Sequence, residues 1–192
     1  MEMHKDVPVY LFTTAEQWAE WLEKNHERVS AVWLKFAKKN TGAVSISYDE
    51  ALDEALCYGW IDGLINSYDE KYYLTRFTPR GAKSIWSKRN REHIARLLKE
   101  KKMKPAGLLT VETAKKSGQW EAAYDSSREM TIPEDFLTEL AKDEKALAFY
   151  HTLNKANLYA IGWRLQTAKK PQTRAKRFES LLTMLKKGEK LH

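Results

Sequence analysis

Apolar residues near the start of the chain repeat at the spacing of one helix face. In TTAEQWAEWLEKN, Trp18, Trp21 and Leu22 fall on the same side of a helix, with polar residues between them. Thr14 and Gln17 form a capping box directly before these residues. The pattern therefore predicts a first helix that begins after Thr14.

The next apolar residues alternate, which is the spacing of a β-strand. In AVWLKFAKK, Val32, Leu34 and Phe36 point to one face, and Trp33 and Lys35 point to the other. We therefore expect a half-buried strand at this position.

Helical spacing returns in SISYDEALDEALCYG. Ser47 lies three residues before Glu50, and acidic residues fill the first turn, where they favour the positive end of a helix. Gly59 supplies a stop signal. The apolar stripe of this helix consists of Ala51, Leu52, Ala55 and Leu56.

A β-hairpin is predicted next, because the period of two returns in WIDGLINSY and KYYLTRF. The two segments lie on either side of Asp69 and Glu70, which would form the turn. Pro79 and Gly81 then end the second strand.

The remainder of the chain is predicted to be helical. Ser84 can cap a helix that runs to about Met103. Pro105 suits the first turn of another helix, which ends near Gly118. Three more helical patterns follow: one opened by Pro133, one from Leu147 to Arg164 with an interruption near Asn154, and one from Pro171 to Lys187 with Phe178, Leu181, Leu182 and Leu185 on one face.

Taken together, these elements predict an α+β fold. We expect a small antiparallel sheet, made of one strand plus a β-hairpin, with packed helices, followed by a helical C-terminal unit. The segment EAAYDSSREMT has no sustained period and is typical of a connector. We therefore assign residues 1–120 to an α+β domain, 121–132 to a connector and 133–192 to a helical C-terminal domain.

Composition indicates a soluble globular protein, since 43% of the 192 residues are hydrophobic and 31% are charged. No apolar run approaches the roughly 20 residues that a membrane span needs, so we expect no membrane insertion. The start, MEMHKDVPVYLF, lacks the apolar region of a signal peptide. A single cysteine cannot form an intramolecular disulfide. These features predict a cytoplasmic location.

The net charge of +7 is concentrated in two segments. Residues 76–104 hold 11 basic and 2 acidic residues, and residues 164–192 hold 9 basic and 2 acidic residues. Residues 1–75, by contrast, hold 7 basic and 13 acidic residues. Such clustering can be the footprint of a polyanion partner, although charge runs are more often solvated faces. The alternative is internal neutralisation, in which the acidic first third folds against the basic helix.

The sequence contains no GxSxG, HExxH or CxxC motif, and its five histidines are scattered. We therefore predict no metal site and no cofactor. Cys57 lies in an apolar helix stripe and is expected to be a buried small hydrophobe. His93 could be a general base, but the sequence assigns it no partner.

Functional residues are expected where the hairpin meets the following helix. Asp62 lies on the first hairpin strand and Arg76 on the second, so directly opposed positions would make an ion pair. A register shifted by one residue would put the two side chains on opposite faces. The sequence does not fix the register, and both arrangements stay open.

The loop and helix start add further polar and aromatic side chains to this corner. A helix N-terminus beside two arginines is suited to an anion, and two tryptophans could form aromatic walls. Core packing is the alternative role for each tryptophan. The candidate ligand-binding residues are Trp60, Asp62, Arg76, Arg80, Ser84, Trp86 and Asn90.

Several of these segments resemble one known family. ALDEALCYGWIDG, RFTPRGAKSIWSKRN, MKPAGL, AAYDSS, NLYAIGWRLQTAKKPQTRAKRFES and LKKGEKLH are similar to the YdeI/OmpD-associated family, often labelled bacteriocin-protection proteins. The resemblance runs from about Phe12 to the C-terminus. It implies a stress-tolerance role and an association with an outer-membrane porin, but no established reaction or cofactor.

Three functions remain open at this stage. The first is a cytoplasmic stress-tolerance protein that binds an anionic small molecule, or a protein partner, at the strand-to-helix corner. The second is nucleic-acid binding by the two basic helical segments, with Trp86 stacking on a base. The third is an enzyme of unknown reaction that uses Asp62, His93 or Cys57. Because most bacteriocins are cationic, a chain of charge +7 favours an indirect protective role over direct binding of such peptides.

Overall fold

A computed structural model describes residues 2–125 and 129–192. The chain forms two compact units, which are treated separately below. The first unit comprises the chain up to Ser84 together with Asn90–Glu121. The second comprises Ile85–Arg89 and the chain from Ala122 to the C-terminus. Residues 126–128 of the expected connector lie outside the described residues.

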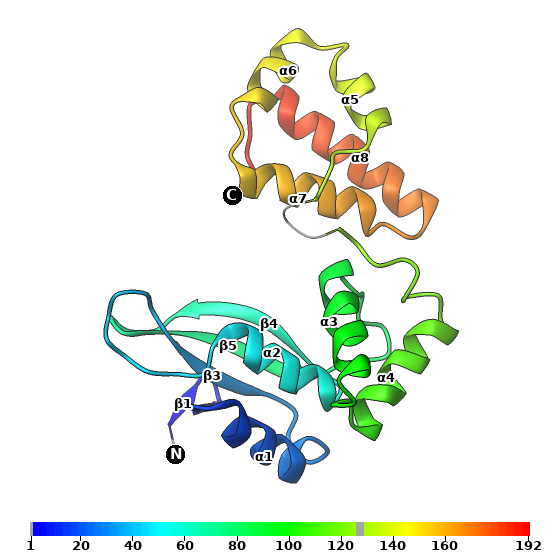
Figure 1. Ribbon diagram of the computed structural model, residues 1–192. Coiled ribbons are helices and arrows are strands. Elements are labelled where there is room, and N and C mark those ends of the chain that lie inside the picture. The colour runs from blue at the N-terminus through cyan, green and yellow to red at the C-terminus, as the bar shows by residue number, and fades with distance from the viewer. Residues whose placement is uncertain (1, 126–128) are drawn as a thin grey trace. The chain divides into compact units, whose positions relative to one another are not determined.

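The first unit is built on a mixed sheet with strand order β1-β2-β3-β5-β4 (Figure 1). Its strands are β1 (Met3–His4), β2 (Val7–Tyr10), β3 (Val32–Ala37), β4 (Trp60–Ser67) and β5 (Tyr72–Pro79). The α+β class, the strand at β3 and the β4–β5 hairpin are confirmed. The observed sheet has more strands than the sequence predicts. It is also mixed and not wholly antiparallel, because β2 pairs parallel with β3. The N-terminal strands have only two and four residues, which is too short for a period of two to be visible in the sequence.

Two helices, α1 (Ala15–Asn25) and α2 (Tyr48–Cys57), lie on one face of this sheet (Figure 1). Both begin where the capping residues predicted. The Thr14 hydroxyl accepts a hydrogen bond from the backbone N–H of Gln17. At α2, the Ser47 hydroxyl and the Glu50 carboxylate each accept from the other residue's backbone N–H. These local bonds satisfy the free N–H groups of the first turn and fix where each helix starts.

The next helix, α3, spans Lys88–Lys99, and the expected start at Ser84 is wrong. The backbone N–H of Ser84 donates to the Gly81 carbonyl, which closes a turn. Ser87 then forms an isolated parallel bridge with Tyr124. Because this bridge holds the chain extended, the helix begins three residues later than the cap pattern indicates.

Helix α4 (Pro105–Lys116) begins at its proline, as expected, and packs against the end of α2. The contact is made through Gly107. A Cβ atom at this position would lie 2.3 Å from the carbonyl oxygen of Cys57. Only glycine allows the two helices to approach this closely.

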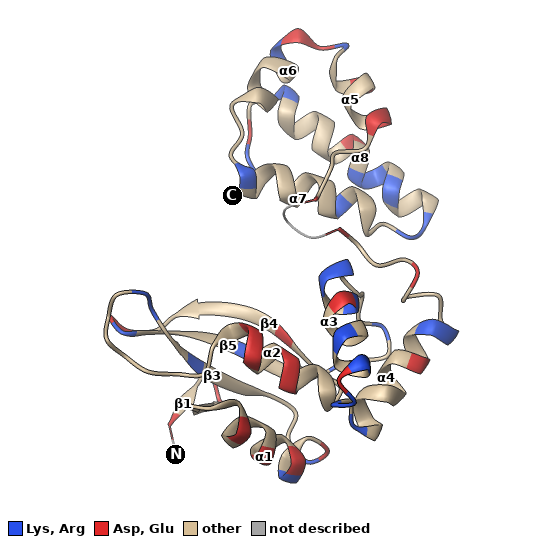
Figure 2. Cartoon of the chain, in the orientation of Figure 1, with Lys and Arg blue, Asp and Glu red and all other residues tan. Residues whose placement is uncertain are grey.

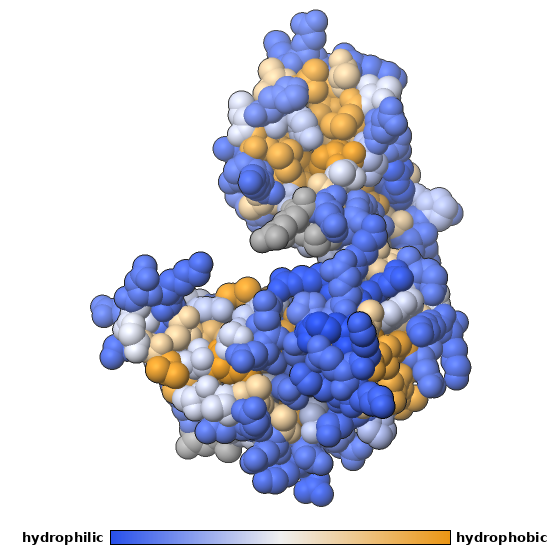
Figure 3. Space-filling model, in the orientation of Figure 1, coloured by the Kyte–Doolittle hydropathy of each residue, from blue (hydrophilic) through white to orange (hydrophobic). Residues whose placement is uncertain are grey.

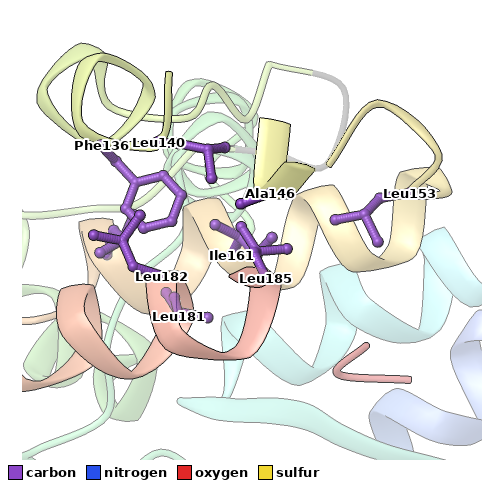
Figure 4. Packing of buried hydrophobic residues seen from close by; sticks show 9 residues of the cluster. Phe136, Leu140, Ala146, Leu153, Ile161, Leu181, Leu182 and Leu185 are labelled. Carbon is purple, nitrogen blue, oxygen red and sulfur yellow. The ribbon is translucent and has the colours of Figure 1, made fainter. Parts of the chain in front are cut away.

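The second unit contains four helices around a core of its own: α5 (Glu134–Leu140), α6 (Glu144–His151), α7 (Lys155–Gln166) and α8 (Pro171–Lys186). Figure 4 shows Phe136 and Leu140 of α5 pointing toward Leu181, Leu182 and Leu185 of α8. The predicted interruption is confirmed, because Asn154 caps α7 after α6 has ended. The apolar face predicted for the last helix is the face that enters this core.

Within residues 2–125 and 129–192, no helix is both long and apolar enough to span a membrane.

Candidate functional site

The register of the β4–β5 hairpin decides whether Asp62 and Arg76 meet. Asp62 lies opposite Phe77, and a bulge follows before Ile65 pairs with Thr75. Directly opposed residues share a face, so Asp62 lies on the face of Phe77, whose ring contacts Trp18 of α1. Arg76, one position away, points to the other face. The ion pair considered for Asp62 and Arg76 is therefore not formed.

Asp62 and Trp60 both form hydrogen bonds on the sheet face that α1 and α2 cover. The Tyr48 hydroxyl, at the start of α2, donates to Asp62 Oδ2 at 2.6 Å. Trp60 is 1% exposed, and its indole N–H donates to the His26 carbonyl at 3.1 Å. Its ring packs edge-on against Trp18, with ring centroids 6.3 Å apart. Trp60 is thus part of the core and not the wall of an open site.

Arg76 lies on the sheet face that points away from α1 and α2, directly opposite Trp33 of β3. Lys35 of β3 projects from the same face. Lys35 is neutralised, because its ammonium lies 2.6 Å from a Glu2 carboxylate oxygen. The same ammonium, followed by the Tyr68 hydroxyl, holds the pKa of the Glu2 carboxyl below its usual value. Arg76 is half-buried, and none of the described residues supplies it with a carboxylate.

The indole of Trp33 adds an unused donor beside Arg76. Trp33 is 2% exposed and packs with Val9 and Leu74, and the His4 ring meets it edge-on at 5.1 Å. Its Nε1 is buried, yet no acceptor among the described residues lies within hydrogen-bond distance. A buried N–H without a partner costs about 1–3 kcal/mol. A guanidinium and an indole N–H, both donors, therefore lie on neighbouring strands, and no residue that the structure describes supplies an acceptor to either.

The remaining candidate residues are largely buried. Arg80 is 9% exposed, and its backbone N–H donates to the Gly59 carbonyl at 2.8 Å. Asn90 is 8% exposed in the first turn of α3. Ser84 lies in the turn before that helix and does not cap it. Trp86 is 2% exposed and belongs to the second unit, where its carbonyl accepts from the N–H of Tyr124.

The acidic and basic segments of the first unit neutralise each other in part. Figure 2 shows acidic residues along α2 and basic residues along α3. Asp53 of α2 accepts from His93 at 2.6 Å through one oxygen and pairs with Arg96 through the other. Glu100 in turn pairs with Arg96 and Lys102. Internal neutralisation, one of the two interpretations of the charge pattern, is confirmed for Asp53 of the acidic first third and Arg96 of the basic helix.

Cys57 has the buried, unreactive environment expected from its sequence position. It is 1% exposed at the end of α2. Burial, with a smaller contribution from the neighbouring carboxylate of Glu54, raises the pKa of the Cys57 thiol to about 12. A thiol with this pKa carries almost no thiolate at neutral pH, so Cys57 is not a nucleophile. In the described part of the chain, no group of three or more His, Cys, Asp or Glu side chains is placed to hold a metal ion.

Trp33 was not among the candidate residues, although the sequence holds a signal for it. The alternation in AVWLKFAKK already puts Trp33 on the face opposite Val32 and Leu34. The order of strands and the β3–β5 register are what bring it opposite Arg76. Both depend on contacts between distant parts of the chain, which a single sequence does not specify.

The chain matches two family models. Residues 10–110 match the domain of unknown function (DUF8412), and residues 129–188 match the family described as "Bacteriocin-protection, YdeI or OmpD-Associated". The second match bears out the resemblance noted in the sequence, within those residues. Neither the curated proteins nor the solved structures contain a match to the chain.

Proposed function

We propose that this chain, which belongs to the family defined by the domain of unknown function DUF8412, binds an anionic small molecule. The residue that would bind the anion is Arg76. The observation that carries the proposal is the contrast between the two cations on the outer sheet face. Lys35 has Glu2 as its counter-ion, whereas no described residue neutralises Arg76.

Retaining a half-buried guanidinium without a counter-ion is unfavourable, and an anion in solution relieves that cost. A guanidinium binds a carboxylate through two parallel hydrogen bonds. Trp33 and Leu74, the neighbours of Arg76 on this face, are buried in the core, so the guanidinium itself would make the contact with the ligand. The proposed ligand is therefore a small carboxylic acid.

The test is thermal unfolding of the whole chain with a panel of aliphatic and aromatic carboxylates, at constant ionic strength. Arg76→Ala should abolish ligand stabilisation, and Arg76→Lys should retain only part of it, because lysine lacks the bidentate fork. Lys71→Ala, an exposed lysine at the hairpin tip, makes the same change in charge and should behave as the wild type. Arg80 is a poorer choice for the test, because it is 9% exposed and its substitution would destabilise the fold itself.

Trp33→Phe separates the two donors of the proposed site. It keeps an aromatic ring on the sheet but removes the buried N–H. If the ligand uses this N–H, the variant should bind more weakly; in the free form, losing the unpaired N–H and leaving a small cavity act on stability in opposite directions. Equal stabilisation of wild type and Arg76→Ala by every carboxylate tested would refute the proposal.

The proposed setting is the cytoplasm, in tolerance of antimicrobial stress. Support comes from the description of the family matched by residues 129–188, which names bacteriocin protection. With a net charge of +7 the chain repels cationic peptides at long range, so we propose that protection acts indirectly, through the bound anion. A strain that lacks the protein should regain bacteriocin tolerance with the wild-type chain but not with Arg76→Ala. Full rescue by the variant would separate anion binding from protection.

A further inference from the structure

A second basic site lies within the C-terminal unit, between helices α7 and α8. A cavity of about 290 Å³ is lined by residues of both helices, and we call this cavity the α7–α8 cleft. Its lining consists of Arg164 from α7 and Thr173, Lys176, Arg177, Ser180 and Leu181 from α8. The α8 residues recur at intervals of three and four positions, so they form one face of that helix.

The cleft concentrates positive charge without a counter-ion. Three of its six lining side chains are cationic, and none is a carboxylate. Among the described residues, no carboxylate pairs with Arg164, Lys176 or Arg177. The next cation along α8 shows the difference, because Arg174 lies outside the cleft and pairs with Asp135 at 2.8 Å.

Arg177 is held in place by the end of α7. Its Nη1 donates to the Arg164 carbonyl at 2.8 Å and to the Thr167 hydroxyl at 3.2 Å. These bonds use one of its three guanidinium nitrogens. They fix the side chain in advance, so that a ligand does not have to order it on binding.

The hydroxyl groups and the helix terminus favour an anion in the same place. Thr173 is the third residue of α8, in the turn where the helix dipole carries partial positive charge. Thr173 and Ser180 each add a hydroxyl that can donate to an oxygen ligand. Leu181, which is 2% exposed, gives the cleft an apolar floor.

We propose that the α7–α8 cleft binds the phosphate group of a small phosphorylated molecule. Three cations and two hydroxyls match a dianion with three terminal oxygens better than they match a carboxylate with two. The volume is at the lower end of the range for ligand pockets, which is roughly 300–1,000 Å³. It suits a compact phosphate ester such as a sugar monophosphate. This site is independent of the one proposed at Arg76, because its residues all belong to the second unit.

The experiment titrates the whole chain with inorganic phosphate and with ribose 5-phosphate, and follows backbone amide shifts by NMR. Acetate and chloride at matched ionic strength serve as ion controls. We expect saturable shifts at Thr173 and Ser180, and affinity about tenfold weaker in Arg164→Ala and in Lys176→Gln, since each removes one charged hydrogen-bond donor. Lys186→Gln removes a charge from the last residue of α8, outside the cleft, and should bind as the wild type does. Arg76→Ala should also keep phosphate binding.

Three results would overturn the proposal. The first is equal affinity in wild type, Arg164→Ala and Lys176→Gln. The second is an equal response to chloride, which would reveal a general ionic effect. The third is binding of oligonucleotides but not of either phosphate, which would assign the cleft to a nucleic-acid surface. Because Arg164 and Lys176 are exposed, neither substitution removes core packing, and circular dichroism of each variant checks that it is folded.

Discussion

The surroundings of two glutamates in α2 decide how far the pKa of each carboxyl group departs from its usual value. Glu50 and Glu54 lie one helical turn apart, but their pKa values are shifted in opposite directions. Hydrogen bonds from the Ser47 side chain and backbone lower the pKa of Glu50. Burial raises the pKa of Glu54, and the nearby Lys102 only partly offsets it. The charged form of glutamate is therefore favoured by the fold at Glu50 and disfavoured at Glu54.

Glu54→Gln should raise the thermal midpoint at pH 7–8. A carboxyl whose pKa is higher in the folded state contributes stability that is fully present below its unfolded pKa and is lost as pH rises through the folded value. Glutamine resembles the protonated acid, so the gain should shrink as pH falls towards about 4. The measurement is the thermal midpoint of both chains across this pH range.

Glu50→Gln is the matched control on the same helix, and its effect has the opposite sign. Because the folded-state pKa of Glu50 is lowered, its contribution is present above the unfolded pKa and is lost as pH falls through the folded value. The variant should be less stable than the wild type near neutral pH and equal to it in acid. Two variants that shift in the same direction at every pH would contradict the assignment for both residues.

At the level of elements, the features predictable from sequence are those that depend on local contacts. The starts of α1 and α2, the break before α7 and the apolar face of α8 all follow from caps and helical spacing within a few residues. The start of α3 was misplaced because the bridge between Ser87 and Tyr124 overrides a local cap. In the proposed site, Arg76 was a candidate from the sequence, whereas Trp33 comes to lie opposite it through a strand pairing that no local pattern encodes.

The contact between α2 and α4 yields a prediction about packing. Gly107→Ala places a methyl group 2.3 Å from the Cys57 carbonyl oxygen and 2.7 Å from that of Leu56, both backbone atoms that cannot rotate away. Separating the helices should lower the free energy of unfolding by about 1–3 kcal/mol or more. Gly81→Ala is the control, because its nearest neighbour would be the Ser84 hydroxyl at 3.6 Å. Urea denaturation of the three chains should give Gly81→Ala a free energy of unfolding close to that of the wild type. Equal stability of all three chains would show that α4 shifts at little cost.

At the scale of the whole molecule, the number of basic residues overstates the positive charge that is available to a polyanion. In the first unit, Arg96 and Lys102 are occupied by Asp53 and Glu100. In the second unit, Lys88 pairs with Asp125. Figure 3 shows a largely hydrophilic surface over α3, which fits a solvated basic face as well as a binding surface. Nucleic-acid binding by both basic segments therefore remains the second function to test.

Paired cations release few counterions, because they already have carboxylate partners when DNA arrives. We expect the affinity for a labelled duplex of about 20 base pairs to fall with salt at a log–log slope shallower than about −3, and to vanish near 0.2 M salt. Fluorescence anisotropy across a salt series gives this slope. Lys99→Gln, at the exposed end of α3, and Lys101→Gln, in the turn after it, should each reduce the slope by less than about one. A slope steeper than about −6, with binding that persists at 0.2 M, would mean that the two basic segments act together on nucleic acid. The unpaired cations of the α7–α8 cleft would then belong to that surface and not to a pocket for a small phosphate.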